Sequence, residues 1–301
     1  MKIVITGSLG HIGNPLATAL IQKGHAVTVV SSKPEKRAAI EALGATAAIG
    51  ALQDADFLTD TFEGADAVYA MVPPNPGVPD IRAYYLQIGN NYVRAIRKTG
   101  VRRVVFLSSM GADLDKGTGI VLGAHDVEGI LGGLSGVALT VLRPGYFYYN
   151  LYSYVGQIRG VGLISDNFGG EDTLVMVSPD DIATAAAEEL QAAGSVDRIR
   201  YIASDERTAT EVARALGAAI GMPGLKWIIC SDTQRLEELE KFGVPPVFAA
   251  GLVEMTANIH SGAFYEDYYT QKLAPTGKVK LEDFLREFAA AFKQGNVAQH
   301  G

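Results

Sequence analysis

The chain has 301 residues, which is enough to bury a substantial core in one large α/β domain or in a core domain with a smaller lobe. Hydrophobic residues make up 48% of the chain and charged residues 20%, so the composition excludes an intrinsically disordered protein. The net charge of -7, from 26 basic and 33 acidic residues, argues against direct nucleic-acid binding, which needs clustered cations to neutralise phosphates.

The cysteine count and the N-terminal sequence narrow the kind of protein and its expected location. Cys230 is the single cysteine, so no intramolecular disulfide can form, and the five histidines show no metal-binding spacing. The N-terminal MKIVITGSLG lacks the pattern of a signal peptide, and no apolar run reaches the roughly 20 residues that a membrane helix needs. We therefore predict a cytoplasmic protein that binds neither a membrane nor a metal ion.

The first 32 residues predict a strand, a glycine-rich turn, a helix and a second strand. KIVIT (2–6) is the first strand, PLATALIQKG (15–24) the helix and HAVTVVSS (25–32) the second strand. Such a unit is typical of doubly wound parallel sheets. Between strand and helix, Gly7, Gly10 and Gly13 permit a tight turn, the approach of a pyrophosphate and close packing, and the N–H groups of the helix meet the phosphates. The segment predicts a dinucleotide site.

The end of the second strand bears on the choice of dinucleotide. A site for NAD usually has an acidic residue there, but this chain has Ser31, Ser32 and Lys33, followed by Lys36 and Arg37. Hydroxyls and cations suit a 2′-phosphate, so we predict NADP(H), with NAD(H) as the alternative cofactor. Alternatively, some of these cations are only the solvated start of the helix that runs to Leu43.

The alternation of strands and helices continues to residue 109. Strands are expected within 45–52, 65–72 and 101–109, and helices at 54–64 and 81–100. This order predicts an α/β protein with a Rossmann-like doubly wound parallel sheet and a smaller C-terminal α/β lobe. The proline-rich segment 73–79 follows a strand directly and forms either a rim over the cofactor or a rigid turn. The expected cofactor contacts are Thr6, Gly7, Leu9, Gly10, His11, Ile12, Gly13, Ser31, Ser32, Lys33, Lys36, Met71, Val72, Pro73, Ser108 and Ser109.

Several motifs resemble known families. TGSLGHIG (6–13) resembles the extended and atypical short-chain dehydrogenase/reductases (SDRs). VVFLSSMGA (104–112), HDVEGIL (125–131), LTVLRPGYFYYN (139–150) and MVSPDDIATAAAEEL (176–190) resemble the NmrA-like branch of the atypical SDRs. The likeness covers nearly the whole chain and is least distinctive over 225–275.

The resemblance implies a Rossmann core that binds NADP(H) and a smaller C-terminal lobe that closes a substrate cleft. We place the core at residues 1–150, with strands from about 172–204 returning to it, and the substrate or partner lobe mainly at 151–301. Some members of the family resemble NAD(P)H-dependent reductases of quinones or other small molecules. Others bind the dinucleotide and act as redox sensors through protein partners.

The catalytic residues of an ordinary short-chain reductase are incomplete here. Such enzymes use a tyrosine, a lysine four residues later and a serine. Ser108 or Ser109 can supply the serine, but no tyrosine lies between Ser109 and Pro144. The pair Tyr268 and Lys272 has the right spacing, but we interpret it as a coincidence in the C-terminal lobe. Ordinary carbonyl reduction is therefore disfavoured.

A helix at 125–131 carries the remaining candidates for catalysis. His125 and Glu128 are three residues apart and lie on one helical face. His125 is then the group nearest the ribose or substrate, and Glu128 either orients it or helps to close the cleft. Alternatively, both belong to a polar stripe in solvent. The family more often places a basic residue four positions before the glutamate, where this chain has Ala124.

The aromatic segment 146–150 follows a strand end and predicts a substrate slot. Tyr146, Phe147, Tyr148 and Asn150 would form an apolar wall with polar tips, suited to a flat quinone. The alternative is that these rings pack in a core between the lobes.

Two functional hypotheses remain. We favour an NADPH-dependent reductase of quinone-type or other small electrophilic substrates, with Ser108, His125 and Glu128 as the catalytic candidates. The alternative is a non-catalytic NADP(H) redox sensor that acts through a protein partner, and a homodimer is compatible with either. A sugar-nucleotide epimerase is weaker because it also needs the Tyr-x-x-x-Lys pair.

Overall fold

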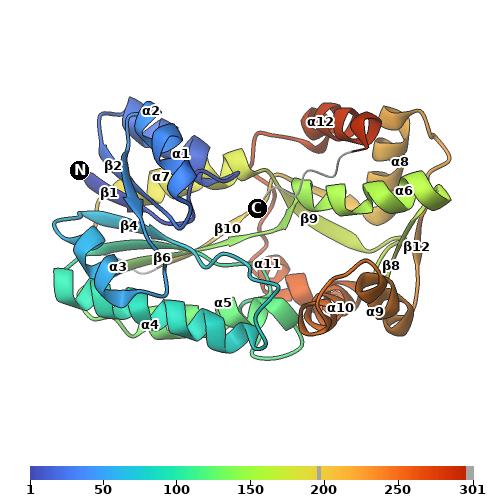
Figure 1. The fold of residues 1–301 in the computed structure, drawn as a ribbon. Helices are drawn as coiled ribbons and strands as arrows, with labels where there is room; N and C mark the ends of the chain where they lie inside the picture. The colour runs from blue at the N-terminus through green and yellow to red at the C-terminus, as the bar shows by residue number, and fades with distance from the viewer. Residues whose placement is uncertain (195–197, 296–301) are drawn as a thin grey trace. The chain divides into compact units, whose positions relative to one another are not determined.

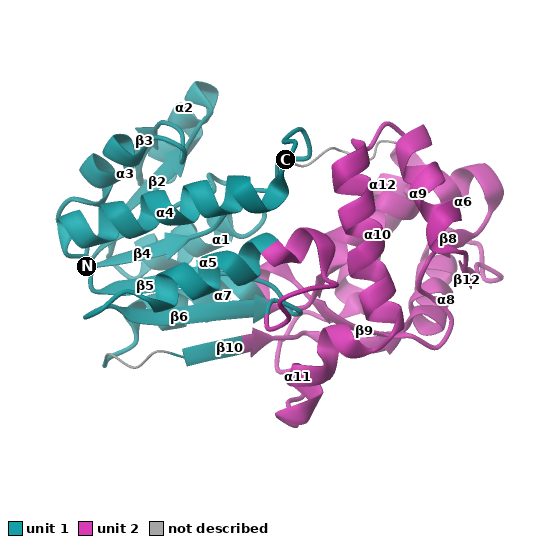
Figure 2. Ribbon diagram, turned by 90° about the horizontal axis from the view of Figure 1, so that it is seen from below, with its two compact units in different colours: residues 1–112, 123–143, 182–200 teal, residues 113–122, 144–181, 201–301 magenta. Residues whose placement is uncertain are grey.

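The computed structural model describes residues 1–194 and 198–295. The chain forms two compact units, drawn in teal and magenta in Figure 2. Unit 1 comprises residues 1–112, 123–143 and 182–200, and unit 2 comprises 113–122, 144–181 and 201–301. The chain thus enters unit 2 first at residue 113, whereas the sequence placed one main division at residue 150. The domain boundaries themselves remain a prediction.

A seven-stranded sheet is the centre of unit 1 (Figure 1). Its order is β10-β6-β5-β4-β1-β2-β3, and the five neighbouring pairs from β6 to β3 are all parallel. This sheet confirms the predicted α/β, Rossmann-like class. The strands are β1 (Lys2–Ile5), β2 (Ala26–Ser31), β3 (Thr46–Ile49), β4 (Ala67–Ala70), β5 (Arg103–Leu107), β6 (Ala138–Pro144) and β10 (Arg198–Ile202).

Helices cover both faces of this sheet, which is why every residue of β4 and β6 is buried. In Figure 1, α3, α4 and α5 lie below the sheet, while α1, α2 and α7 lie above it. The lower core includes the rings of Phe62 and Tyr92, stacked with centroids 6.2 Å apart. The helices are α1 (Gly13–Gln22), α2 (Arg37–Ala42), α3 (Ala55–Phe62), α4 (Ile81–Thr99), α5 (Leu122–Gly132) and α7 (Pro179–Gln191), and η1 (Pro34–Lys36) is a 3₁₀ turn.

The strand order reverses between β1 and β4. From β1 the chain builds outward through β2 and β3, and from β4 it builds the other way through β5 and β6. Ligands of open α/β sheets bind outside the carboxyl ends of the strands at such a switch point. By this rule, a ligand of unit 1 is expected to contact the residues that follow β1, β2, β4 and β5.

Unit 2 contains two small sheets with short helices. In the three-stranded sheet β11-β9-β7, β9 pairs antiparallel with β11 and parallel with β7, and β8 pairs parallel with β12. The strands are β7 (Tyr146–Phe147), β8 (Ile164–Asp166), β9 (Thr173–Val177), β11 (Asp205–Thr208) and β12 (Trp227–Ile229). The helices are η2 (Gly119–Val121), η3 (Tyr148–Tyr154), α6 (Val155–Val161), α8 (Ala209–Ile220), α9 (Asp232–Lys241), α10 (Pro246–His260), η4 (Ala263–Tyr265), α11 (Glu266–Thr270) and α12 (Leu281–Gln294).

Two features are absent from the described residues. Among them, no helix combines the length and apolar character needed to span a bilayer. Over the same residues, no three His, Cys, Asp or Glu side chains come together as a metal site. The cytoplasmic location remains a prediction.

Candidate functional site

The predicted cofactor residues of unit 1 lie in four loops at one edge of the sheet. Residues 6–13 follow β1, residues 32–36 follow Ser31 at the end of β2, 71–73 follow β4, and Ser108 and Ser109 follow β5. Since β5, β4, β1 and β2 are neighbours and parallel, their carboxyl ends meet at the same edge. Residues spread over about a hundred positions are thus brought to one place.

The glycine-rich turn after β1 has a tightly constrained backbone. Gly7 and Ser8 both have positive φ, at 93° and 62°, and the Ser8 N–H donates to the carbonyl of Val30 over 2.9 Å. A Cβ at Gly13 would lie 2.0 Å from the Ser8 carbonyl oxygen. Gly7 therefore provides the turn, and Gly13 allows α1 to begin directly against it.

Gly10 differs from these two glycines because it is exposed and uncrowded. A Cβ there would meet only the Gly7 carbonyl oxygen, at 3.7 Å. No side chain caps the start of α1. The Asn14 N–H donates to the Gly10 carbonyl over 3.1 Å and Pro15 has no N–H, so the Gly13 N–H is the donor of the first turn that can meet an anion approaching past Gly10. Of the other predicted contacts in this turn, Leu9 and Ile12 are half-buried and His11 is exposed.

Thr6 connects the turn to the sheet through its side chain. Its buried hydroxyl donates to the Tyr69 carbonyl over 3.2 Å, accepts from the Met71 N–H over 3.0 Å, and lies 3.0 Å from the Tyr92 hydroxyl. Tyr92 also donates to the Met71 carbonyl over 2.7 Å, and burial raises its pKa. The Thr6 hydroxyl is fully used in holding β1 to β4 and α4, so only its backbone remains for a ligand.

The end of β2 carries serine hydroxyls at the place where an NAD site usually has an acidic residue. Ser31 is buried, and its hydroxyl accepts from Ser8 Oγ over 3.0 Å and from the Lys33 N–H over 3.2 Å. Ser32 and Lys33 are exposed and Lys36 is half-buried. Ser8 was not among the sequence candidates, although its place between two glycines of the turn is the signal that marks it.

Ser108 lies in a buried polar cluster with Glu128 and Arg143. Its hydroxyl donates a short hydrogen bond to Glu128 Oε1. Arg143, at the end of β6, donates to the same carboxylate from Nε over 3.1 Å and from Nη2 over 2.6 Å. The side chains of Arg143 and Glu128 are only 6% and 11% exposed. Since a carboxylate only accepts, the proton of Ser108 is directed at Glu128.

This cluster corrects the expected pairing on α5. Glu128 does not orient His125, because both of its oxygens are bound to Ser108 and Arg143. His125 is half-buried, and its Nδ1 lies 2.8 Å from the Ala112 carbonyl oxygen. That oxygen can only accept, so Nδ1 carries a proton. Arg143 was missed in the sequence, where Leu-Arg-Pro at a strand end was the available signal.

The loop after β4 contributes the remaining predicted cofactor residues at this edge of the sheet in unit 1. Val72 is buried, Met71 and Pro73 are half-buried, and a Cβ at Gly7 would lie 2.7 Å from the Met71 sulfur. Ser109 is half-buried beside Ser108 in sequence. The predicted cofactor residues of this unit therefore share one edge of the sheet.

The predicted substrate residues all belong to unit 2. Tyr146 and Phe147 form β7 and are half-buried, and Asn150 is half-buried in η3. Tyr148 is only 1% exposed; its ring stacks on Phe284 at 5.7 Å, so this residue packs in the core of unit 2. The structure thus separates Tyr148 from its more accessible neighbours.

The Tyr-x-x-x-Lys sequence at 268–272 does not form one helical face. Tyr268 is 2% exposed in α11 and donates to Glu206 Oε1 over 2.9 Å. The helix ends at Thr270, and Lys272 follows it with a φ of 54°. The tyrosine hydroxyl is bound to a carboxylate of unit 2.

Comparison with known proteins places the chain in a family. The sequence model of a family described as NAD(P)H-binding matches residues 7–193. The chain belongs to this NAD(P)H-binding family, as a member of the NmrA-like, atypical SDR type. The matched range contains the glycine-rich turn, Ser108, His125, Glu128 and Arg143.

Relatives match this family member over nearly its full length. It is 26% identical to a (4-alkanoyl-5-oxo-2,5-dihydrofuran-3-yl)methyl phosphate reductase of Streptomyces griseus, and the match covers 96% of this chain and 99% of the relative. It is also 26% identical to an NAD(P)H azoreductase of Xenophilus azovorans, with the same two coverages. Among solved structures, the NADPH-dependent quinone oxidoreductase QOR2 of Escherichia coli in complex with NADPH has the same fold, with a TM-score of 0.80 and 22% identity over 95% of this chain and 99% of that one.

The open position at Gly10 gives a direct test of the dinucleotide site. Gly10→Val should fold normally but lose at least about tenfold in NADPH affinity, because its methyl groups occupy the space through which a pyrophosphate approaches the backbone. Calorimetric titration with NADPH measures the loss. Gly129→Val is the matched control, since a Cβ at Gly129 meets no atom within 4 Å. Unchanged affinity in Gly10→Val would refute the site.

The buried cluster predicts a stability effect. Glu128→Gln should lower the free energy of unfolding by about 3 kcal/mol, because it leaves the buried Arg143 guanidinium without its counter-charge. Asp56→Asn is the control; its partner Arg94 is 57% exposed, so the loss should stay below about 1 kcal/mol. Urea titrations of both variants measure the difference, and equal losses would contradict the role of the pair.

Proposed function

We propose that this protein is an NADPH-dependent reductase that transfers hydride to small electrophilic acceptors, with quinones as the first candidates. The observation that carries the proposal is the turn from Gly7 to Gly13, which presents an uncapped helix start at the switch point of the sheet. The full-length likeness to a (4-alkanoyl-5-oxo-2,5-dihydrofuran-3-yl)methyl phosphate reductase and to an NAD(P)H azoreductase supports a reductase in particular.

The preference for NADPH over NADH is supported by the end of β2. Residues 31–34 contain no carboxylate that would bind the ribose hydroxyls and repel a 2′-phosphate. Ser32 and Lys33 are exposed there and can contact that phosphate, while Ser31 holds the loop through its hydrogen bonds to Ser8 and Lys33. Gly10 and the start of α1 would bind the pyrophosphate.

Ser108 and His125, the catalytic candidates in unit 1, favour substrates that need no proton in the step that transfers hydride. The Ser108 proton is directed at Glu128, and the His125 Nδ1 proton is directed at the Ala112 carbonyl. When bound, the reduced nicotinamide supplies the hydride. A quinone that accepts hydride becomes a stabilised phenolate, whereas a simple aldehyde becomes a strongly basic alkoxide that needs an acid. Ser108 and His125 would then bind and orient rather than protonate.

The sensor hypothesis has less support. The curated relatives described above are named as reductases, and their length equals that of this chain within a few per cent. A protein partner and a homodimer remain predictions without a structural test. A dinucleotide sensor would bind NADPH but would not oxidise it, whichever acceptor is added.

The proposal is tested by following NADPH oxidation at 340 nm with a panel of quinones, azo dyes and aldehydes. We expect turnover of quinones above the buffer rate, weaker or no turnover of aldehydes, and loss of both in Gly10→Val. Calorimetry establishes that NADPH is bound in the assay. Bound NADPH without any turnover would overturn the reductase and favour the sensor.

Cofactor preference is tested by Ser32→Asp. A carboxylate at this exposed position should repel a 2′-phosphate and lower the NADPH-to-NADH affinity ratio by about tenfold or more. Ser135→Asp introduces the same charge at another exposed serine of unit 1, in the loop after α5, and should leave the ratio unchanged. If Ser32→Asp also leaves the ratio unchanged, the 2′-phosphate does not lie at the end of β2.

A further inference from the structure

The cluster of Ser108, Glu128 and Arg143 in unit 1 fixes the direction of a hydroxyl group. Arg143 donates to Glu128 Oε1 over 3.1 Å and to Oε2 over 2.6 Å, so both oxygens of Glu128 act as acceptors. The Ser108 hydroxyl donates to Glu128 Oε1. A serine has a single hydroxyl proton, so this bond leaves the Ser108 oxygen only its lone pairs for a further contact.

The backbone of Ser108 is also held in place at the end of β5. Its N–H donates to the carbonyl of Leu142, the residue before Arg143 on β6, over 2.8 Å. Residues 104–106 of β5 are fully buried, whereas Ser108 is 8% exposed. The chain therefore leaves the buried core of the sheet at Ser108, at the edge where the predicted cofactor residues of unit 1 lie.

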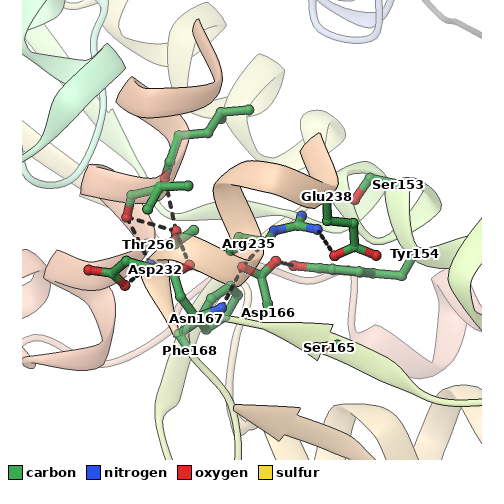
Figure 3. A network of polar contacts seen from close by, with 12 residues as sticks. Ser153, Tyr154, Ser165, Asp166, Asn167, Phe168, Asp232, Arg235, Glu238 and Thr256 are labelled. Atoms are coloured by element: carbon green, nitrogen blue, oxygen red, sulfur yellow. Dashed lines mark hydrogen bonds and ion pairs between the residues drawn. The ribbon is translucent and has the colours of Figure 1, made fainter. Parts of the chain in front are cut away.

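The same three kinds of group meet in unit 2, where they join η3, β8 and α9. Figure 3 shows the Asp166 carboxylate between the Tyr154 hydroxyl and the Arg235 guanidinium. Tyr154 donates to Asp166 Oδ2 over 2.6 Å, and Arg235 Nε lies 3.0 Å from Oδ1. Tyr154 is 3% exposed, and its ring packs edge-on against Trp227 with centroids 4.8 Å apart. This enclosed cluster is the structural counterpart of the one at Ser108.

The order of the strands indicates which half of the cofactor is expected at Ser108. Under the proposed function the pyrophosphate lies at Gly10, after β1, and the 2′-phosphate at Ser32, after β2. In the sheet, β2 lies on one side of β1, and β4 and β5 lie on the other. A dinucleotide lies across the point where the strand order reverses, so its nicotinamide half is expected at the loops after β4 and β5. Residues 71–73 after β4 have no polar side chain, so the hydroxyls nearest these strand ends belong to Ser108 and Ser109.

We propose that Ser108 accepts a hydrogen bond from an N–H or O–H donor of the ligand in the nicotinamide half of the site, and that Glu128, held by Arg143, is the positioning residue that turns its proton inward. The proposal rests on the proposed reductase function and deepens it. The serine of an ordinary short-chain reductase orients a carbonyl, for which it has to donate. The donor has two possible sources, the carboxamide of the cofactor and the substrate.

Calorimetry with two oxidised cofactors tests the carboxamide. NADP⁺ carries an amide NH₂ group, and its 3-acetylpyridine analogue has a methyl group in that place and keeps the carbonyl. The readout is the dissociation constant of the analogue divided by that of NADP⁺. If the carboxamide is the donor, Ser108→Ala should lower this ratio about tenfold, the value of one hydrogen bond, because it removes the acceptor.

A matched pair of quinones tests the substrate. 2-Amino-1,4-naphthoquinone carries an N–H donor, and 2-methyl-1,4-naphthoquinone has a methyl group of similar size in its place. The readout is kcat/KM for the amino compound divided by that for the methyl compound, and comparison between variants cancels the intrinsic difference in reactivity. If the substrate is the donor, Ser108→Ala should lower this ratio about tenfold and leave the calorimetric ratio unchanged.

Glu128→Gln tests the positioning role. The glutamine carbonyl can accept from Arg143 while its amide donates to Ser108, so the Ser108 proton turns toward the ligand. The ratio that falls in Ser108→Ala should therefore fall in Glu128→Gln as well. In the double variant it should equal the value for Ser108→Ala, because Glu128 acts through the Ser108 hydroxyl, whereas independent structural damage would add to the loss. Circular dichroism establishes that each variant is folded under the assay conditions.

Two control variants should leave both ratios unchanged. Tyr154→Phe removes the corresponding buried hydroxyl from the cluster in unit 2. Asp126→Asn removes a carboxylate from the same helix as Glu128, where it pairs with Arg82, whose side chain is 49% exposed.

The outcomes separate this proposal from the reductase. If quinones are reduced and both ratios are unchanged in Ser108→Ala, the proposal is overturned while the reductase stands. A ratio that falls in Ser108→Ala but not in Glu128→Gln overturns the positioning role of Glu128. If the wild type binds NADP⁺ but reduces no quinone, the reductase is wrong, and an unchanged calorimetric ratio in Ser108→Ala then overturns this proposal as well.

Discussion

The approach of the Ser8 carbonyl to Gly13 is the constraint on which the dinucleotide site depends. The oxygen lies 2.0 Å from the place where a Cβ would be, so α1 can begin against the turn only with glycine at this position. The positive φ of Gly7 and Ser8 brings the backbone to that point. Since α1 then starts without a side-chain cap, the Gly13 N–H remains available at the edge where the strand order reverses between β1 and β4.

A second constraint recurs in both units. In unit 1 a buried carboxylate, Glu128, pairs with Arg143 and takes the proton of Ser108; in unit 2 Asp166 pairs with Arg235 and takes the proton of Tyr154. In each case the arginine donates to the carboxylate, and the carboxylate accepts from a neighbouring hydroxyl and so fixes the direction of its proton. Under the proposed function, Ser108 held in this way could only accept a hydrogen bond from a ligand, which suits substrates that need no acid from the protein.

Much of unit 1 was predictable from the order of its residues. β-branched runs, the glycine turn and the spacing of strands and helices predicted the parallel sheet, and the family motifs predicted membership in the NAD(P)H-binding family. These signals are local, because a strand, a turn and a helix start are each determined within a few residues. The pairing of Glu128 with His125 was wrong, since spacing on a helix says nothing about a strand-end arginine that competes for the carboxylate.

The sequence by itself determined the α/β order, the positions of Gly7, Gly10 and Gly13, and the lack of a carboxylate at residues 31–34. Only the tertiary structure decided which hydroxyl protons are taken. Ser108 and Glu128 are 20 positions apart, and Tyr154 and Asp166 are 12 apart on different elements. The direction of a hydroxyl depends on the charged neighbour that packing delivers to it in a buried environment, and no local pattern of residue types contains that information.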